Sequence, residues 1–74
     1  MIICSEDRRE IVNLIASIHT RYRYRIKKDE RESFIYLTID SNFLMCSADI
    51  KKVIWYLIGF RDALFLEKHS REER

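Results

Sequence analysis

The sequence has no proline and no glutamine, and Gly59 is its one glycine. A single glycine excludes the glycine-rich loops that bind phosphate groups, because those loops need several glycines. No apolar run is long enough to span a bilayer, since the longest one extends only from Val53 to Phe60. The start of the chain also lacks the basic segment and apolar run of a secretory signal. We therefore expect a cytoplasmic protein, in the host cytoplasm if it is viral, without membrane contact.

Cysteine and histidine are scarce as well. Cys4 and Cys46 are far apart in the chain, and together with His19 they would be an incomplete set of zinc ligands. In a reducing cytosol we expect both thiols to be unpaired and buried, whereas in a hyperthermophilic archaeon or its virus they would form a disulfide. The composition favours glutamate, lysine, arginine and isoleucine over amides, as thermophilic proteins do. The sequence leaves the redox state open and predicts no metal and no cofactor.

No group of residues has a catalytic pattern. His19 lies near the end of an expected helix, where a histidine usually stabilises the helix C-terminus. His69 lies in the charged C-terminal segment. We therefore expect a protein that is not an enzyme and has no small-molecule substrate.

The length of 74 residues allows one domain. Hydrophobic residues make up 47% of the chain, which is too many for a disordered protein. A domain of this size buries only about 60% of the surface that its unfolded chain exposes, so a partner often covers more. We expect a single α+β domain over residues 1–68 and a charged, flexible tail over residues 69–74.

Hydrophobic periodicity predicts a first helix over residues 6–19, with Ser5 as its N-cap. Glu6 and Asp7 place negative charge in the first turn, where the helix dipole favours it. The apolar stripe of this helix has the spacing i, i+3, i+4, i+7. It comprises Ile11, Leu14, Ile15 and Ile18, and Val12 widens it.

Two strands are expected over residues 21–28 and 33–39, around a four-residue turn at 29–32. This turn length places Lys28 opposite Ser33 and thereby fixes the register. One face then carries the apolar pairs Ile26–Ile35, Tyr24–Leu37 and Tyr22–Ile39. The other face carries the pairs Lys27–Phe34, Arg25–Tyr36, Arg23–Thr38 and Arg21–Asp40.

Residues 43–46 fit either a short third strand or an extended lead-in to the second helix. That helix is expected to run from a cap at Ser47 to Lys68, with Asp49 in its first turn. The predicted fold is a two-layer α-β-β-(β)-α sandwich, in which an antiparallel hairpin sheet packs on two helices. The far face of the sheet would be uncovered.

This uncovered face is expected to combine positive charge with aromatic rings. Arginine and lysine bind phosphate groups, and aromatic rings stack on unpaired bases, so one hypothesis is a DNA- or RNA-binding regulator. Its candidate residues are Arg21, Arg23, Arg25, Lys27 and Tyr36. The plainer alternative is a solvated face whose arginines pair with nearby acidic residues. Phe34 beside Tyr36 favours a protein partner, because an exposed aromatic pair is costly in water.

The second helix has more apolar residues than one buried stripe needs. Trp55 and Leu66 are expected to point away from the core, with Gly59 and Ala63 between them. Two large residues beside two small ones form a groove into which another helix packs. The leading hypothesis is therefore a small regulatory protein of viral, plasmid or accessory type that binds proteins and forms a homodimer. Its predicted interface residues are Trp55, Gly59, Ala63, Leu66, Phe34 and Tyr36.

Overall fold

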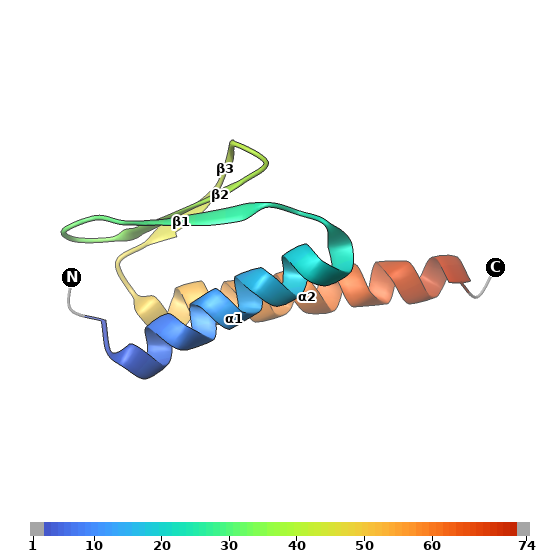
Figure 1. The fold of residues 1–74 in the computed structure, drawn as a ribbon, viewed down its shortest axis with the longest axis horizontal. Coiled ribbons are helices and arrows are strands. Elements are labelled where there is room, and N and C mark those ends of the chain that lie inside the picture. The colour runs from blue at the N-terminus through green and yellow to red at the C-terminus, as the bar shows by residue number, and fades with distance from the viewer. Residues whose placement is uncertain (1–2, 73–74) are drawn as a thin grey trace.

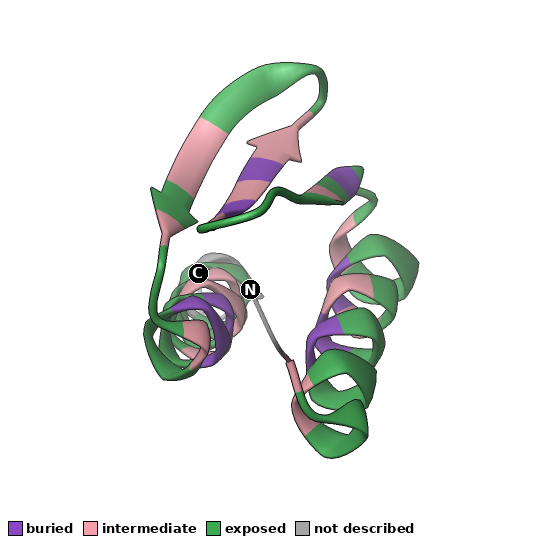
Figure 2. Ribbon diagram, turned by 90° about the vertical axis from the view of Figure 1, so that its left-hand side faces the viewer, coloured by how far each residue is buried: buried purple, intermediate pink, exposed green. Residues whose placement is uncertain are grey.

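The computed structural model describes the backbone of residues 3–72 and side chains as far as His69. The chain forms α1 (Ser5–Tyr22), β1 (Ile26–Glu30), β2 (Ile35–Ile39), β3 (Asn42–Ser47) and α2 (Ile50–Glu72). One antiparallel sheet in the order β1-β2-β3 lies over the two helices (Figures 1 and 2). The predicted two-layer α+β fold is confirmed, and residues 43–46 belong to a third strand.

The first helix is longer than predicted at both ends. Its N-cap is Cys4 rather than Ser5, and the Cys4 side chain makes no capping hydrogen bond. Its C-cap is Arg23, which adopts the left-handed conformation (φ 67°) and donates its backbone N–H to the His19 carbonyl oxygen at 2.9 Å. The prediction of a strand over residues 21–28 is therefore wrong for residues 21–25, because Arg21 and Tyr22 are helical and β1 begins only at Ile26.

The pairing of β1 with β2 also differs from the predicted register. Ile26 lies opposite Ile39 rather than Ile35, and Leu37 lies opposite Lys28 rather than Tyr24. The connection is the turn at residues 31–34 rather than 29–32. Because the shift is by an even number of residues, the predicted residues that do lie in β1 and β2 keep the face that the alternation predicted. The predicted partners are wrong, but for these strand residues the assignment of the two faces holds.

A tight turn at Asp40 and Ser41 joins β2 to β3. Both residues have positive φ angles, 48° and 69°, as in the mirror-image turns that suit a two-residue hairpin. A bulge between Leu37 and Thr38 interrupts the pairing of β2 with β3. This turn makes β2 the central strand and leaves β1 and β3 as the sheet edges.

The N-cap of α2 is Asp49, two residues after the predicted cap at Ser47. The Asp49 carboxylate accepts the Lys51 backbone N–H at 3.0 Å, which is the geometry of an N-cap. The Ser47 hydroxyl accepts the Asp49 N–H at 3.0 Å and so supports the cap from the preceding turn. At its other end α2 continues past Lys68 to Glu72. Figure 1 shows this C-terminal part of α2 extending beyond both α1 and the sheet.

The core lies between the sheet and the paired helices, where buried residues face inward in Figure 2. Its buried members are Ile11, Leu14, Ile18, Ile26, Ile35, Leu37, Val53, Ile54 and Leu57. All are aliphatic, and among the described residues no polar or charged side chain is buried. The far side of the sheet has no helix over it (Figure 2).

Candidate protein-interaction surfaces

The outward face of α2 carries the apolar stripe predicted from the sequence, here called the α2 stripe: Trp55, Gly59, Ala63 and Leu66. All four residues are exposed, Trp55 by 68% and Leu66 by 66%. Phe65 beside the stripe is 46% exposed. Two large apolar side chains thus flank two small residues on open helix surface.

Gly59 lies at a position where the chain itself does not require glycine. Its φ is not positive, and a Cβ built on it would meet no atom within 4 Å. Glycine in a helix interior costs about 1 kcal/mol relative to alanine. By contrast, Arg23, Asp40 and Ser41 have the positive φ angles that favour glycine, yet none of them is glycine. Packing within the chain therefore does not explain the glycine at position 59.

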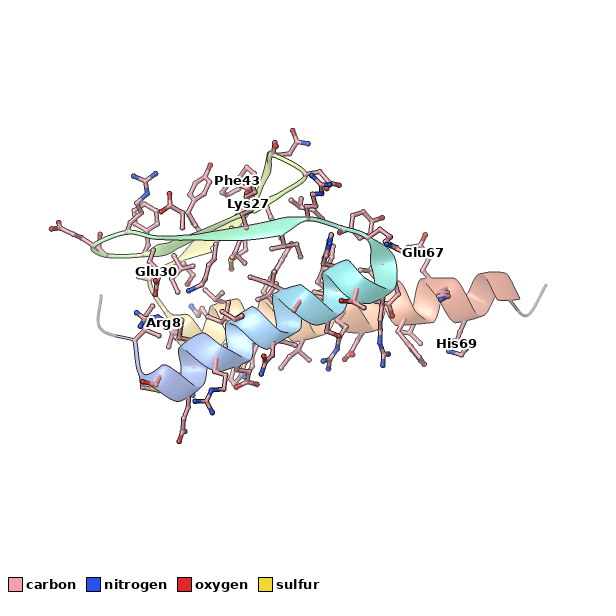
Figure 3. All side chains as sticks on the ribbon, viewed as in Figure 1. Arg8, Lys27, Glu30, Phe43, Glu67 and His69 are labelled. Carbon is pink, nitrogen blue, oxygen red and sulfur yellow. The ribbon has the colours of Figure 1, made fainter. Side chains whose placement is uncertain are left out.

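The uncovered side of the sheet presents an aromatic pair. The Tyr36 and Phe43 ring centroids are 5.2 Å apart, and Phe43 is 59% exposed. Figure 3 shows Phe43 and Lys27 on the side of the sheet away from the helices. Phe34, predicted to lie on this face, is half-buried in the turn between β1 and β2. The exposed partner of Tyr36 is Phe43 instead.

Sequence reasoning missed Phe43 because it did not fix the turn before β3. A two-residue turn at positions 40 and 41 places Phe43 opposite Thr38 and so brings it onto the same face as Tyr36. The Asp-Ser pair lacks the glycine that usually marks such a turn. The only signal available was the aspartate, which tolerates the left-handed conformation better than most residues.

The basic residues predicted to bind nucleic acid do not form one row. Arg21 lies in the last turn of α1, and Arg23 caps that helix. Arg25 lies between α1 and β1, where its backbone N–H donates to the Asp40 carboxylate at 3.2 Å. Of the four, only Lys27 lies in a strand. A continuous basic strand beside Tyr36 is therefore absent.

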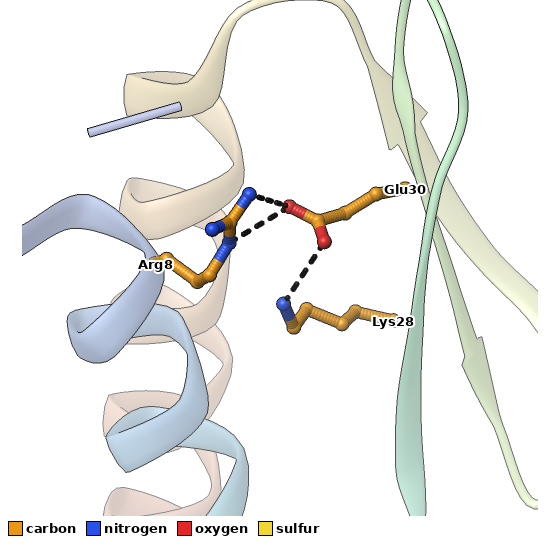
Figure 4. Close-up of polar contacts among 3 residues, drawn as sticks. All are labelled: Arg8, Lys28 and Glu30. Atoms are coloured by element: carbon orange, nitrogen blue, oxygen red, sulfur yellow. Dashed lines mark hydrogen bonds and ion pairs between the residues drawn. The ribbon is translucent and has the colours of Figure 1, made fainter. Parts of the chain in front are cut away.

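An ion pair joins α1 to the end of β1 (Figure 4). The Arg8 guanidinium donates to Glu30 Oε1 from Nε at 3.1 Å and from Nη2 at 3.0 Å. Lys28 Nζ lies 3.5 Å from Glu30 Oε2. Burial by itself would raise the pKa of Glu30, but the Arg8 hydrogen bond and the Lys28 and Arg8 charges hold that pKa below its ordinary value of 4.5. The pair thus bridges α1 and the end of β1 on exposed surface.

A second ion pair joins the first turns of the two helices. Lys51 Nζ lies 3.0 Å from Asp7 Oδ1, and the Asp7 side chain is only 14% exposed. The hydrogen bond from Lys51, with a second one from Cys4, lowers the pKa of Asp7 from its ordinary value of 3.8. The same contact raises the pKa of Lys51.

We expect this contact to contribute to stability at neutral pH and to be lost in acid. A carboxylate whose pKa is lowered by folding stabilises the native state above its ordinary pKa, and the contribution disappears as the pH falls through the folded-state value. In a Lys51→Met variant the Asp7 pKa should rise towards 3.8, which NMR titration of the carboxyl carbon would detect. The matched control is Lys52→Met, an exposed neighbour. Equal Asp7 titration curves in the two variants would show that Lys51 does not hold the carboxylate.

The two cysteines are exposed free thiols, so the expectation that they are buried is wrong. Within the described part of the chain, no three histidine, cysteine, aspartate or glutamate side chains gather into a group that would hold a metal ion. No helix among the described residues is long and apolar enough to cross a membrane.

Comparison with known proteins finds no match: no protein-family model, no curated protein and no solved structure is significantly similar to this chain. The functional argument therefore rests on the surfaces described above.

Proposed function

We propose that this protein is a small regulatory or accessory protein that acts by binding other protein chains, and that it forms a homodimer through the α2 stripe. The observation that carries the proposal is Gly59, which costs helix stability although neither its φ angle nor its neighbours within the chain require glycine. A helix from a second copy would use the space above it. Close approach of two helices is the ordinary reason for keeping a small residue at a helix interface.

The stripe is also complementary to itself. In an antiparallel crossing centred between Gly59 and Ala63, these small residues meet their counterparts, and Trp55 of each copy meets Leu66 of the other. Such a two-fold interface uses the same surface on both copies. It would cover the two most exposed large apolar residues of the described chain, Trp55 and Leu66. Tryptophan in the centre of an interface usually contributes much of the binding energy.

The alternative function, a DNA- or RNA-binding regulator, draws support from the uncovered sheet face. Lys27, Tyr36 and Phe43 share that face and offer one cation and two rings. Arg21 and Arg23 lie outside its strands. Protein binding through α2 is therefore the better supported function, and nucleic-acid binding is the second candidate.

Enlarging Gly59 should abolish the dimer without harming the monomer. Gly59→Leu adds a side chain whose Cβ meets no neighbour within the chain but that would hold two α2 helices apart. Trp55→Ala should weaken the dimer on the order of thirty-fold, as expected for an interface hot spot. Sedimentation equilibrium over a range of protein concentrations would measure both effects.

The control is Asn13→Leu, which places the same new side chain on an exposed position of α1, away from the α2 stripe. This variant should dimerise like the wild type, and circular dichroism should show that all variants are folded. A Gly59→Leu protein with the wild-type dissociation constant, or a wild-type protein that is monomeric at all concentrations, would refute the proposal.

A further inference from the structure

An open groove lies between α1 and β1, here called the β1 groove. Its volume is about 550 Å³, and its walls are residues 25–28 on the strand side and Val12, Ile15, Ala16 and His19 on the helix side. The lining is mainly apolar. Val12 was predicted to widen the buried stripe of α1, but it is 46% exposed. The groove therefore leaves apolar surface of α1 uncovered beside the sheet.

The backbone of β1 presents unpaired groups along this groove. The Asp40 N–H donates to the Arg25 carbonyl oxygen at 2.9 Å, and the Arg31 N–H donates to that of Phe34 at 2.8 Å. In an antiparallel ladder every second residue directs its N–H and C=O to the same neighbour. Residues 25, 27, 29 and 31 thus face β2, whereas 26, 28 and 30 direct theirs outward. Among the described residues no strand pairs with that edge.

The charged side chains at the groove are all positive. Arg25, Lys27 and Lys28 line it, and no acidic residue does. Lys28 is paired with Glu30, but in the described part of the chain neither the Arg25 guanidinium nor the Lys27 ammonium is in an ion pair. Charged side chains on an edge strand discourage pairing with strands of like charge. This edge therefore favours an acidic strand.

A second copy of the chain does not fit the same edge. Figure 2 shows α1 beneath β1. Pairing β1 with β1 of another copy in one sheet would bring the two α1 helices beneath adjacent strands, which are about 4.8 Å apart, whereas packed helices need about 8–10 Å. An extended segment without its own helix layer avoids this clash.

We propose that the β1 groove binds an extended acidic segment of a partner protein, which adds to the sheet as a fourth strand beside β1. Side chains of such a strand alternate between its two faces. An apolar side chain on the helix side covers Val12 and Ala16, and acidic side chains before and after it lie near Arg25 and Lys27. The recognised pattern is acidic–apolar–acidic. This site is separate from the α2 stripe and does not depend on dimer formation.

The test is a fluorescence anisotropy titration with the fluorescein-labelled peptide Ser-Glu-Val-Glu-Val-Glu-Ser at about 50 mM salt, where exposed charges are weakly screened. We expect saturable binding that is at least roughly ten-fold tighter than that of the matched peptide with lysine in place of glutamate. Lys27→Glu should weaken binding roughly five-fold or more, since it replaces an attraction by a repulsion. Lys52→Glu changes the net charge equally but lies on α2, and should leave binding unchanged.

A pair of variants at Lys28 tests strand addition itself. Lys28→Pro removes an N–H that faces the groove and no bond to β2, whereas Lys28→Ala removes only the side chain. Binding should be lost in the first and kept in the second. If circular dichroism shows that Lys28→Pro is unfolded, Ala16→Glu on the exposed face of α1 serves instead, because its carboxylate would fill the groove and repel the peptide.

Equal binding of the acidic and basic peptides, full binding by a folded Lys28→Pro protein, or no saturation of the wild type up to about 1 mM peptide would overturn the proposal. Gly59→Leu should bind the peptide as the wild type does even when it is monomeric. This result would separate failure of the groove-binding proposal from failure of the α2 dimer proposal.

Discussion

Leu57→Ala is expected to lower the free energy of unfolding by about 2–5 kcal/mol, the usual cost of removing a large side chain from a packed core. Leu57 is 0% exposed and belongs to the same buried cluster as Leu14 of α1 and Leu37 of β2. It therefore contributes to the contact between both helices and the sheet. A domain of this length has a total stability of roughly 4–11 kcal/mol, so the variant should lose a large part of it. Urea denaturation followed by circular dichroism would measure the change.

Leu66→Ala makes the same chemical change on the same helix. Leu66 is 66% exposed in the monomer. We therefore expect Leu66→Ala to lower the free energy of unfolding by less than about 0.5 kcal/mol when the protein is dilute. At higher concentration the variant should lose stability relative to the wild type, because a dimer stabilises the folded state by mass action. If Leu57→Ala and Leu66→Ala lowered the free energy of unfolding equally at low concentration, the burial described above would be contradicted.

Two arginine-to-glycine substitutions in neighbouring turns should change stability in opposite directions. Arg23→Gly is expected to raise the free energy of unfolding by roughly 0.5–1 kcal/mol, because a non-glycine residue in the left-handed region costs about 1–2 kcal/mol and glycine's extra unfolded-state entropy offsets part of the gain. Arg21 lies in the last turn of α1. Arg21→Gly should lower the free energy of unfolding by up to about 1 kcal/mol.

Thermal and urea unfolding of the two variants would measure these changes, and each variant is the control for the other. Both lose one arginine and the same positive charge, so electrostatic effects are similar. Shifts in the same direction would mean that Arg23 does not adopt a positive φ in solution.

The helices and the two-layer architecture were predictable because apolar spacing is a strong signal that depends on few assumptions. The end of α1 was not. The alternation in RYRYRIKK suggests a strand, and the usual stop signal for a helix is a glycine, whereas here Arg23 takes that conformation. Because α1 continues to Tyr22, β1 begins later than predicted and pairs with β2 in another register.

The surfaces were predictable to different degrees. The α2 stripe follows from helical periodicity alone, and the structure leaves all four of its residues exposed. The sheet face was predicted correctly for Lys27 and Tyr36, since an even shift preserves alternation. Phe34 was wrongly placed on this face and Phe43 was missed. The side chains that meet across strands depend on the turns between the strands, and this chain makes those turns without glycine. The β1 groove was missed entirely, since the exposure of Val12 depends on how far α1 and the sheet edge separate.

The extension of α2 beyond the sheet would couple the proposed association to helix formation in the last turns of α2. Phe65 and Leu66 are exposed, and α2 continues beyond α1 and the sheet, so its last turns contribute little to the core and can open without unfolding the domain. A partner that covers these residues would also stabilise those turns. Helix formation at the end of α2 and the proposed association would then be a single coupled equilibrium, in which part of the binding energy is used to order the helix.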